Sequence, residues 1–346
     1  WLEARAPEPP AWLAGLFAAA LVAFAWGLHR RGRHPWVAGT VLLAAAAVLV
    51  VHPFPPRLEP GKLELTALDV GQGEALFLAL PEGGTMLVDA GGLASFGSPT
   101  SRGLDIGEEV VAPYLWSRSI RRLDVVAVSH AHGDHIGGLP ALLENFSVGE
   151  LWIGDNPPSE GWARVVETAA RRRVPLVALR AGAVRSLGGV SFEVLWPPPG
   201  YTRENTPSND DSLVLLGRFG EHRFLLSGDI EWRPERQLLE NRRLGRLDLL
   251  KVAHHGSRSS TFGAFLDTTR PWLAVISAGY DSPYGHPHPD VLTRLEARHI
   301  SVLRTDRDGA VSVPTDGRRV VASTFRAPSR LPPPRPLPAL RRVLPE

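Results

Sequence analysis

The hydrophobic pattern divides the chain into two unlike parts. Residues 11–28 and 35–52 form two continuous apolar runs without an internal charge. Each run is close to the length of about 17 to 20 residues that a helix needs to cross a bilayer. Because the turn between them is too short for any other arrangement, the pattern predicts a transmembrane helical hairpin within residues 1–54. A signal peptide followed by a core helix is the alternative interpretation.

Charged and proline residues around the hairpin predict its orientation. Arg30, Arg31 and Arg33 lie between the two runs, and positively charged turns tend to stay on the cytoplasmic side of a membrane. The chain after His52 is therefore expected on the extracytoplasmic side of the cell membrane, in a multi-pass protein that contacts lipid. The proline-rich residues 55–62 predict a stiff linker, because proline ends a helix.

From residue 63 the apolar positions fall into short runs separated by glycine and aspartate. Expected strands cover residues 63–70, 75–80, 85–89, 123–128, 191–196, 212–219, 223–227, 247–252 and 272–277. Expected helices cover residues 108–116, 136–145, 232–243 and 289–298. This alternation predicts one layered α/β domain over residues 63–326. Residues 327–346, rich in proline and arginine, predict a flexible tail.

Composition narrows the chemistry that the domain can perform. A chain of 346 residues that is 44% hydrophobic can bury a large core. It has no cysteine, which excludes thiolate metal sites, disulfides and a cysteine nucleophile. The net charge is +2, and the positive charge is almost all arginine, since lysine occurs only at Lys62 and Lys251. A GC-rich genome gives the same bias, so the net charge identifies no partner.

A cluster of polar residues after the expected strand 123–128 carries the strongest chemical signal. His130, His132, Asp134 and His135 occupy four of six consecutive positions. On a loop at the end of a buried strand, such side chains can converge on one point, whereas a helix or strand face spreads them. Imidazole and carboxylate ligands together suit Zn²⁺ or Mn²⁺ better than Ca²⁺ or Mg²⁺. The cluster therefore predicts a metal site.

This H-x-H-x-D-H pattern, followed by two glycines, resembles the signature of the metallo-β-lactamase superfamily. The resemblance implies an αββα sandwich, here preceded by two transmembrane helices, with two divalent metal ions. It assigns His130 and His132 to site one, and Asp134 and His135 to site two.

Two later segments resemble the remaining ligands of that superfamily. Asp229 follows the apolar strand 223–227 after one glycine, and it resembles the aspartate that bridges both ions. The pair His254 and His255 follows the expected strand 247–252, and one of the two resembles the last ligand. We favour His255, with His254 as the alternative.

A narrower resemblance, from residue 63 to about residue 313, is to the C-terminal domain of the ComEC-family DNA internalisation proteins. The matching segments follow in order: 68–74 (LDVGQGE), 87–91 (LVDAG), 105–107 (DIG), 113–115 (PYL), 209–215 (NDDSLVL), 254–257 (HHGS) and 284–287 (YGHP). The resemblance implies a nuclease that degrades the non-imported DNA strand during natural transformation. Its implied partners are single-stranded DNA and the remainder of the DNA-uptake channel, and the oligomeric state is left open.

One departure from the superfamily pattern concerns site one. Where many members supply a further histidine, this chain has Asn209, Asp210 and Asp211. Asn209 or Asp210 is therefore a candidate oxygen ligand. Oxygen in place of nitrogen shifts the expected ion from Zn²⁺ toward Mn²⁺, and a single fully occupied ion is the alternative to two.

The hypothesis for catalysis follows from the chemistry of phosphodiester cleavage. Two ions about 3.5 to 4 Å apart activate a water molecule and neutralise the phosphoryl oxygens. Asp229 then bridges the ions, and Asp134 orients the attacking water or takes its proton. Asp89 is expected to hold a ligand histidine, with a turn-forming role as the alternative.

Other residues are expected around the substrate. Asp69, Ser257, His286 and His288 either support the ligands or reach the substrate, with a structural role in their loops as the alternative. Candidate contacts to the DNA backbone are Arg203, Arg258 and the run at residues 171–173. For that run, a solvated helix face is the favoured interpretation.

Two other functions remain open from the sequence. The domain could be a surface hydrolase that acts on teichoic acid, phosphorylcholine or a β-lactam. It could also be a non-catalytic module that guides DNA, in which metal serves only folding.

Overall fold

The computed structural model describes residues 7–30, 35–92, 104–202 and 205–326. Contacts divide the chain into two units: Trp1–Leu58 with Ala112–Arg121, and Glu59–Val111 with Arg122–Glu346. The predicted hairpin falls in the first unit, and the predicted metal ligands fall in the second. Arg203 and the expected tail at residues 327–346 lie outside the described residues.

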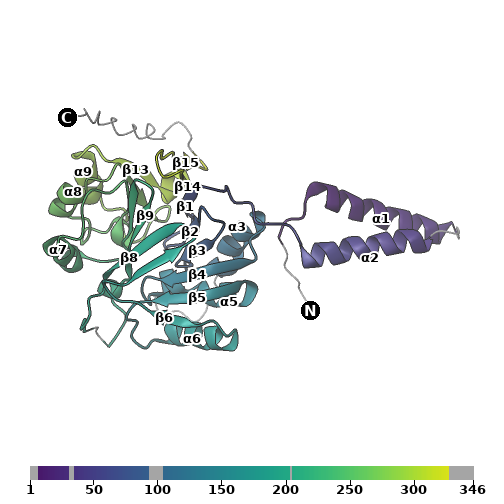
Figure 1. Cartoon of the computed structure of the whole chain (residues 1–346), viewed down its shortest axis with the longest axis horizontal. Coiled ribbons are helices and arrows are strands. Elements are labelled where there is room, and N and C mark those ends of the chain that lie inside the picture. Colours follow the sequence, from purple (N-terminus) through teal and green to yellow (C-terminus); the bar gives the residue numbers. More distant parts are fainter. Residues whose placement is uncertain (1–6, 31–34, 93–103, 203–204, 327–346) are drawn as a thin grey trace, which may run out of the picture. The chain divides into compact units, whose positions relative to one another are not determined.

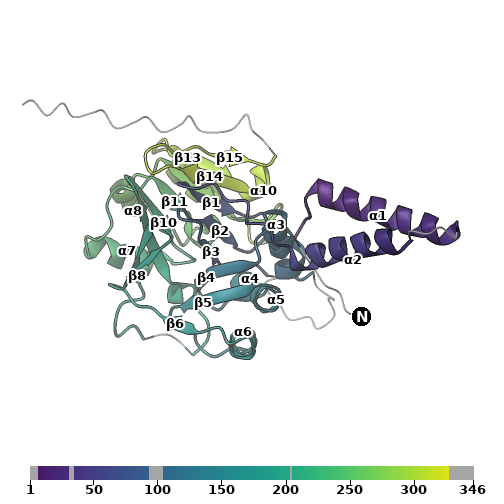
Figure 2. The same cartoon turned by 45° about the vertical axis from the view of Figure 1, so that its right-hand side comes forward.

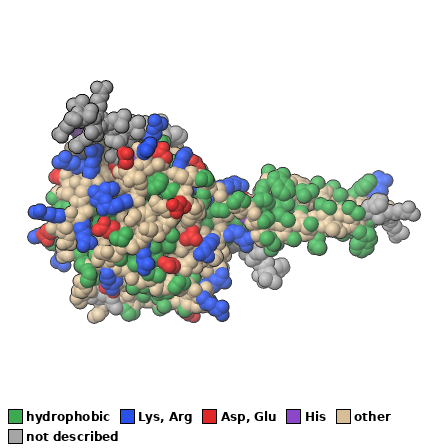
Figure 3. All heavy atoms as spheres, in the orientation of Figure 1, with side chains coloured by type: hydrophobic (Ala, Val, Ile, Leu, Met, Phe, Trp, Pro, Cys, Tyr) green, Lys and Arg blue, Asp and Glu red, His purple; other side chains and the backbone are tan. Residues whose placement is uncertain are grey.

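The first unit contains two apolar helices, α1 (Ala11–His29) and α2 (Pro35–Val51), and the short α3 (Ala112–Ser117). Large hydrophobic side chains on α1 and α2 are exposed, and Trp36 is 81% exposed. Figure 3 shows hydrophobic side chains along these helices. An exposed apolar surface of this kind is typical of a membrane contact. α1 is long and apolar enough to cross a membrane, whereas α2, with 17 residues, is shorter. The helices support membrane association.

The second unit is built on two sheets. The first has the order β15-β14-β1-β2-β3-β4-β5-β6, and the second has the order β13-β12-β11-β10-β9-β8-β7. The first sheet consists of β1 (Leu63–Ala67), β2 (Leu76–Ala79), β3 (Thr85–Val88), β4 (Arg122–Val128), β5 (Ser147–Ile153), β6 (Leu176–Ala178), β14 (Val311–Thr315) and β15 (Ser323–Thr324). The second consists of β7 (Val184–Leu187), β8 (Val190–Trp196), β9 (Val214–Phe219), β10 (His222–Leu226), β11 (Leu249–Lys251), β12 (Leu273–Ile276) and β13 (Ser301–Arg304).

Helices cover the outer faces of the two sheets, as Figures 1 and 2 show. Beside the first sheet lie α4 (Gly133–Ile136), α5 (Leu139–Asn145) and α6 (Glu160–Arg171). Beside the second lie α7 (Trp232–Glu240), α8 (Gly263–Thr269) and α9 (Pro289–Glu296). The remaining helical turns are η1 (Gly107–Val111), η2 (Asn209–Asp211), η3 (Ala253–Gly256) and α10 (Thr305–Asp308). The predicted αββα sandwich is confirmed.

Alternation of side chains along the strands explains why the sheets stack. In β9, Leu215 packs between the sheets with Phe192 and Phe224, while Val214 and Leu216 pack beneath the outer helices. Successive side chains of a strand point to opposite faces. A strand that is apolar on both faces therefore contributes to two hydrophobic cores, one between the sheets and one beneath the outer helices.

Strand direction places the ends of several strands at the same edge. β3, β4 and β5 are mutually parallel, as are β10, β11 and β12. Ser129, which follows β4, accepts a backbone hydrogen bond from Leu213 N at 2.7 Å and so ties the two sheets together there. The predicted ligand segments follow β4, β10 and β11, so the fold brings them to this edge.

Candidate metal centre

The first sheet supplies a histidine whose ring is fixed from behind. Asp89, directly after β3, is fully buried and has a φ of 58°. Its carboxylate accepts hydrogen bonds from the Ser129 backbone N–H at 2.8 Å and from the Ser129 hydroxyl at 2.6 Å. Nδ1 of His135 lies 2.8 Å from the same carboxylate and donates to it. Asp89 therefore sets the ring orientation and leaves Nε2 of His135 facing Asp229.

The second sheet supplies a histidine with its own fixed partner. Nδ1 of His255 donates to the carbonyl of Ser277 at 3.0 Å. Because a carbonyl oxygen only accepts, the lone pair of the neutral ring is on Nε2. Nε2 lies 3.4 Å from Oδ2 of Asp229 and 3.5 Å from Oδ2 of Asp134. The lone pair thus faces two carboxylates.

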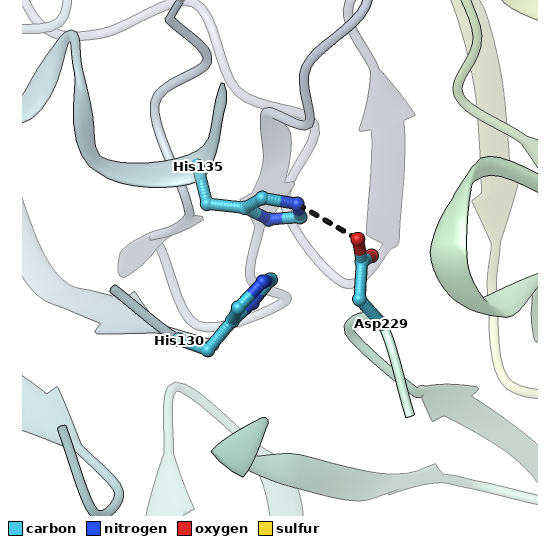
Figure 4. Close-up of side chains that lie close together, drawn as sticks. All are labelled: His130, His135 and Asp229. Atoms are coloured by element: carbon cyan, nitrogen blue, oxygen red, sulfur yellow. Dashed lines mark hydrogen bonds and ion pairs between the residues drawn. The ribbon is translucent and has the colours of Figure 1, made fainter. Parts of the chain in front are cut away.

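The two sheets bring these side chains together at one point. Nε2 of His135 lies 3.2 Å from Oδ2 of Asp229, and Figure 4 shows the two side chains facing each other beside His130. In three overlapping groups, each residue offers a ligand atom within 4.8 Å of the others: His130, His135 and Asp229; Asp134, His135 and His255; Glu74, Asp229 and His255. Donors at this spacing fit metal bonds of about 2.0 to 2.2 Å.

His130 and His132 present another pair of nitrogens. The Ser129 hydroxyl gives its proton to Asp89, so it accepts from Nδ1 of His130, 3.1 Å away. Nε2 of His132 donates to the carbonyl of Pro207 at 3.0 Å. In the neutral tautomers that these bonds select, Nε2 of His130 and Nδ1 of His132 carry lone pairs 2.9 Å apart. The lone pairs repel each other, and a cation bound to both removes the repulsion.

Two buried atoms at the centre have no hydrogen-bond partner among the described residues: Nε2 of His255 and Oδ1 of Asp229. An unsatisfied buried polar group costs about 1 to 3 kcal/mol. A nitrogen and a carboxylate oxygen left in this way, amid further imidazoles and carboxylates, fit a divalent cation. The side chains present therefore suit the metal centre that the sequence predicts.

Electrostatics point the same way. Burial disfavours the charged form of His135, but Asp229, Asp89 and Asp134 outweigh burial and raise its pKa well above the ordinary value. Burial also disfavours ionised Asp229, but His135 and His255 hold its pKa well below the usual range. For His130, burial dominates and lowers the pKa well below the ordinary value. Asp229, Asp89 and Asp134 surround His135, so negative charge exceeds positive charge there. The excess negative charge attracts a cation to the space between these side chains.

A cavity of about 360 Å³ opens onto the centre. His132, Asp134, Asp229 and His255 line its inner part, and Asn209, His254, Tyr284 and His286 line the rest together with Gln72 and Gly133. A space of this size lies within the range of small-molecule sites. The centre is thus accessible to a substrate.

The histidine pair divides into two roles. His255 is 2% exposed and belongs to the ligand groups, whereas Nδ1 of His254 lies 3.3 Å from Oε1 of Glu231. The amide of Asn209 donates to Glu231 at 3.1 Å and lies 3.3 Å from Nε2 of His254. The carboxylate of Asp210 accepts from the backbone N–H of Glu231 at 3.0 Å. Asn209 therefore reaches the cavity, while Asp210 supports the start of α7.

Several residues expected at the substrate have other partners. Asp69 forms an ion pair with Arg326, at 3.1 Å. The hydroxyl of Ser257 lies 3.0 Å from that of Ser259. Nδ1 of His288 accepts from the backbone N–H of Asp290 and caps α9. Among the described residues that line the cavity, only His286 of this expected set is present.

Of the arginines expected to contact the DNA backbone, Arg258 and Arg171 form ion pairs. Arg258 lies 3.0 Å from Asp290, and its side chain is 75% exposed. Arg171 forms ion pairs with Glu144 and Glu167 on the helical surface. α6 ends at Arg171, so only the first of the three arginines at residues 171–173 lies on the helix.

The sequence did not predict a buried ion pair beneath the centre. Nζ of Lys251 donates to Glu74 and to the carbonyl of Val252, and both charged side chains are buried. Glu74 also belongs to one of the ligand groups, with Asp229 and His255. A signal was available, because Lys251 is one of only two lysines in an arginine-rich chain.

The fold and this site define a class of protein. The chain belongs to the metallo-β-lactamase superfamily, whose family profile matches residues 68–279.

Three relatives narrow the similarity to the competence proteins. ComE operon protein 3 of Bacillus subtilis is 35% identical over 254 residues, which are 72% of this chain and 32% of that protein. Recombination protein 2 of Haemophilus influenzae is 32% identical over 250 residues, 72% of this chain and 28% of that protein. Competence protein ComA of Neisseria gonorrhoeae is 31% identical over 310 residues, 89% of this chain and 39% of that protein. The resemblance to the ComEC family is confirmed, and the chain spans roughly a third of the length of these relatives.

Proposed function

We propose that the second unit is a metal-dependent phosphodiesterase that cleaves DNA as part of a DNA-uptake system. The observation that carries the proposal is the convergence of His135, His255, Asp134 and Asp229 on one accessible point. Membership of the superfamily supports a metal-dependent hydrolase. Similarity to two competence proteins supports DNA as the substrate.

The residues around the point have separable tasks. His135, His255, Asp134 and Asp229 would hold one ion, and His130 with His132 would hold a second beside Asp229. Divalent ions in such a site lower the pKa of a bound water and neutralise charge on phosphoryl oxygens. Mn²⁺ is the favoured ion, because Asn209 stands where a further imidazole would favour Zn²⁺.

Two carboxylates orient the reacting groups. Asp134 lines the cavity, and the neighbouring His135 and His255 outweigh burial and hold its pKa below the usual range. A carboxylate that stays ionised accepts a hydrogen bond from the attacking water and so aligns it with the phosphorus atom. Asp89 keeps His135 in a single tautomer, with Nε2 free to bind metal.

The cellular setting is part of the proposal. The apolar helices α1 and α2 would anchor the chain in the membrane, with the second unit on the extracytoplasmic side. There it would act on the strand that is not imported, while the other strand enters the remainder of the channel.

A cleavage assay with a matched pair of variants tests the proposal. The full chain in detergent is given labelled single- and double-stranded oligonucleotides with Mn²⁺. Asp229→Asn replaces the carboxylate with a neutral amide, so each bound ion loses a charged oxygen ligand. Loss of a hydrogen-bond partner of a metal ligand already costs about 10- to 100-fold. We therefore expect cleavage to fall by more than about 100-fold.

The control is Asp267→Asn on α8, since this carboxylate is 63% exposed and pairs with Arg298 away from the cavity. Its cleavage rate is expected to match that of the unaltered chain. Cleavage that survives Asp229→Asn contradicts the proposed site. Turnover of poly(glycerol phosphate) or a chromogenic β-lactam without DNA cleavage would assign a different hydrolase activity. Binding of DNA without any turnover would assign the guiding role.

A further inference from the structure

A row of rings leads from the metal centre to the surface. The ring centroids of His255 and His286 are 6.4 Å apart, with an angle of 22° between the ring planes. Tyr284 continues the row, 6.0 Å from His286 and inclined by 33°. Exposure rises outward, from 2% at His255 to 41% at Tyr284. Tyr280, in the same loop, is 84% exposed. The row thus begins at the buried His255 and ends at the partly exposed Tyr284.

The loop that carries these rings is fixed at its first residues. The hydroxyl of Thr305 donates to the carbonyl of Ala278 at 2.9 Å and accepts from its N–H at 2.9 Å. The backbone N–H of Gly279 donates to the side chain of Gln72 at 2.7 Å. A Cβ at Gly279 would lie 2.8 Å from that side-chain oxygen, so only glycine allows the contact.

The far end and the middle of the loop are fixed as well. His288 N donates to the carbonyl of Gly256 at 2.8 Å, and the hydroxyl of Ser282 accepts from the N–H groups of Tyr284 and His286 at 3.3 and 3.4 Å. A Cβ at Gly256 would lie 2.6 Å from Pro287. The loop is therefore held in place before any substrate arrives, which reduces the entropy lost on binding.

We propose that Tyr284 stacks against an unpaired base of the DNA strand whose phosphate lies at the metal centre. The inference rests on the proposed function and names the residue that would distinguish single-stranded from double-stranded substrate. Bases of a duplex already stack on their neighbours, whereas an unpaired base can lay its face on an aromatic ring. Such stacking tolerates any sequence, because every base has a π face. Tyr284 would thus form a stacking platform that favours single-stranded over double-stranded DNA, whatever the base sequence.

The expected size of the effect is set by stacking on a single ring. Stacking of about 1 to 3 kcal/mol per base corresponds to a change in affinity of about 5- to 150-fold. We expect Tyr284→Leu to weaken binding of a single-stranded oligonucleotide by about tenfold. Tyr284→Phe keeps the ring and is expected to retain binding. Phe325→Leu is the matched control, because Phe325 is 83% exposed but does not line the cavity.

The experiment measures the Kd of labelled oligonucleotides for the full chain in Mn²⁺ by fluorescence anisotropy. The oligonucleotides carry phosphorothioate linkages, which slow cleavage while the metal stays in place. An oligonucleotide of the same length with abasic sites removes the bases but keeps the phosphates. The unaltered chain should prefer the normal strand over the abasic strand by about tenfold, and Tyr284→Leu should bring this ratio close to one. A ratio that Tyr284→Leu leaves unchanged overturns the platform.

Equal affinity for duplex and single strand also overturns it, as does tighter binding of a glycan-bearing teichoic acid through the same tyrosine. The outcome is separate from that of the cleavage test. Cleavage without a base preference would contradict the stacking platform but leave the proposed nuclease activity intact. A base preference without cleavage would support the platform and contradict the nuclease activity.

Discussion

The cavity has a floor, formed by the metal centre around His135 and His255, and a rim around His254. The histidine rings in these two regions are held by different kinds of contact. At the floor, His135 and His255 each donate to one buried acceptor, at 2.8 and 3.0 Å. At the rim, His254 has three longer contacts, to Glu231, Asn209 and Ser259, at 3.3 to 3.5 Å. One short bond fixes a ring for metal binding, whereas several long contacts allow adjustment to a substrate. On the proposed function, the floor would carry out the chemistry, and the rim would determine which substrate is held.

The largest effect is expected from removing the charge beneath the floor. Lys251→Met leaves Glu74 buried without its partner, and breaking a buried pair in this way costs about 3 to 5 kcal/mol. We expect the melting temperature of the full chain to fall steeply. The double variant Lys251→Met with Glu74→Gln leaves no unpaired charge and should recover most of the loss. A single variant as stable as the unaltered chain would show that the pair does not support the floor.

The next effect concerns the carboxyl that supports the rim. Glu235 on α7 accepts from the backbone N–H groups of Thr261 and Phe262, which follow the His254 turn. Burial raises its pKa to about 8, despite these two hydrogen bonds. The folded state then keeps a proton that the unfolded chain loses near its ordinary pKa of 4.5. Stability from this group is complete below that value and falls as the pH rises to about 8.

Glu235→Gln tests this pH dependence, because the amide cannot ionise. A shift of this size corresponds to up to about 5 kcal/mol. The free energy of unfolding of the unaltered chain, relative to that of Glu235→Gln, should therefore decrease between pH 5 and pH 8. Parallel pH profiles for the two proteins would show that Glu235 does not hold a proton in the folded state.

A smaller effect distinguishes Asp89 from Asp69, two aspartates that the sequence predicted near the metal ligands. Asp89→Asn weakens the hold on His135, and loss of such a partner costs about 10- to 100-fold in metal affinity. Asp69→Asn should leave metal affinity unchanged, since Asp69 pairs with Arg326 outside the cavity. Calorimetric titration with Mn²⁺ measures both. Equal losses in the two variants would contradict the separate positions of these aspartates.

The sequence predicted most of the strands because their apolar runs are short and clearly bounded. It missed β5, β6, β7, β13, β14 and β15 and the helices α6 and α8. The start of α6 does carry a local signal, because Ser159 caps it and accepts from the N–H of Trp162. The sequence predicted a continuous helix at residues 136–145, but the chain breaks between α4 and α5. Gly138 approaches Gly107 there, where a Cβ would lie 2.6 Å from the Gly107 nitrogen. Such close packing depends on distant segments and leaves no local pattern.

The ligand types could be predicted from the sequence, but their partners could not. The H-x-H-x-D-H segment lies within six residues, so its chemistry is visible locally. The contact between Lys251 and Glu74 joins residues 177 apart and exists only because two sheets stack. Likewise, the choice between His254 and His255 depends on Glu231 and Ser277, which meet them only in the folded chain.

The most direct test of the metal centre is anomalous scattering from crystals grown with Mn²⁺, measured at the manganese absorption edge. The centre described above predicts a peak about 2.0 to 2.2 Å from Nε2 of His255 and from a carboxylate oxygen of Asp229. A crystal of Asp229→Asn grown in the same way should lose or weaken that peak. Manganese bound only elsewhere on the chain, with none between His255 and Asp229, would contradict the account.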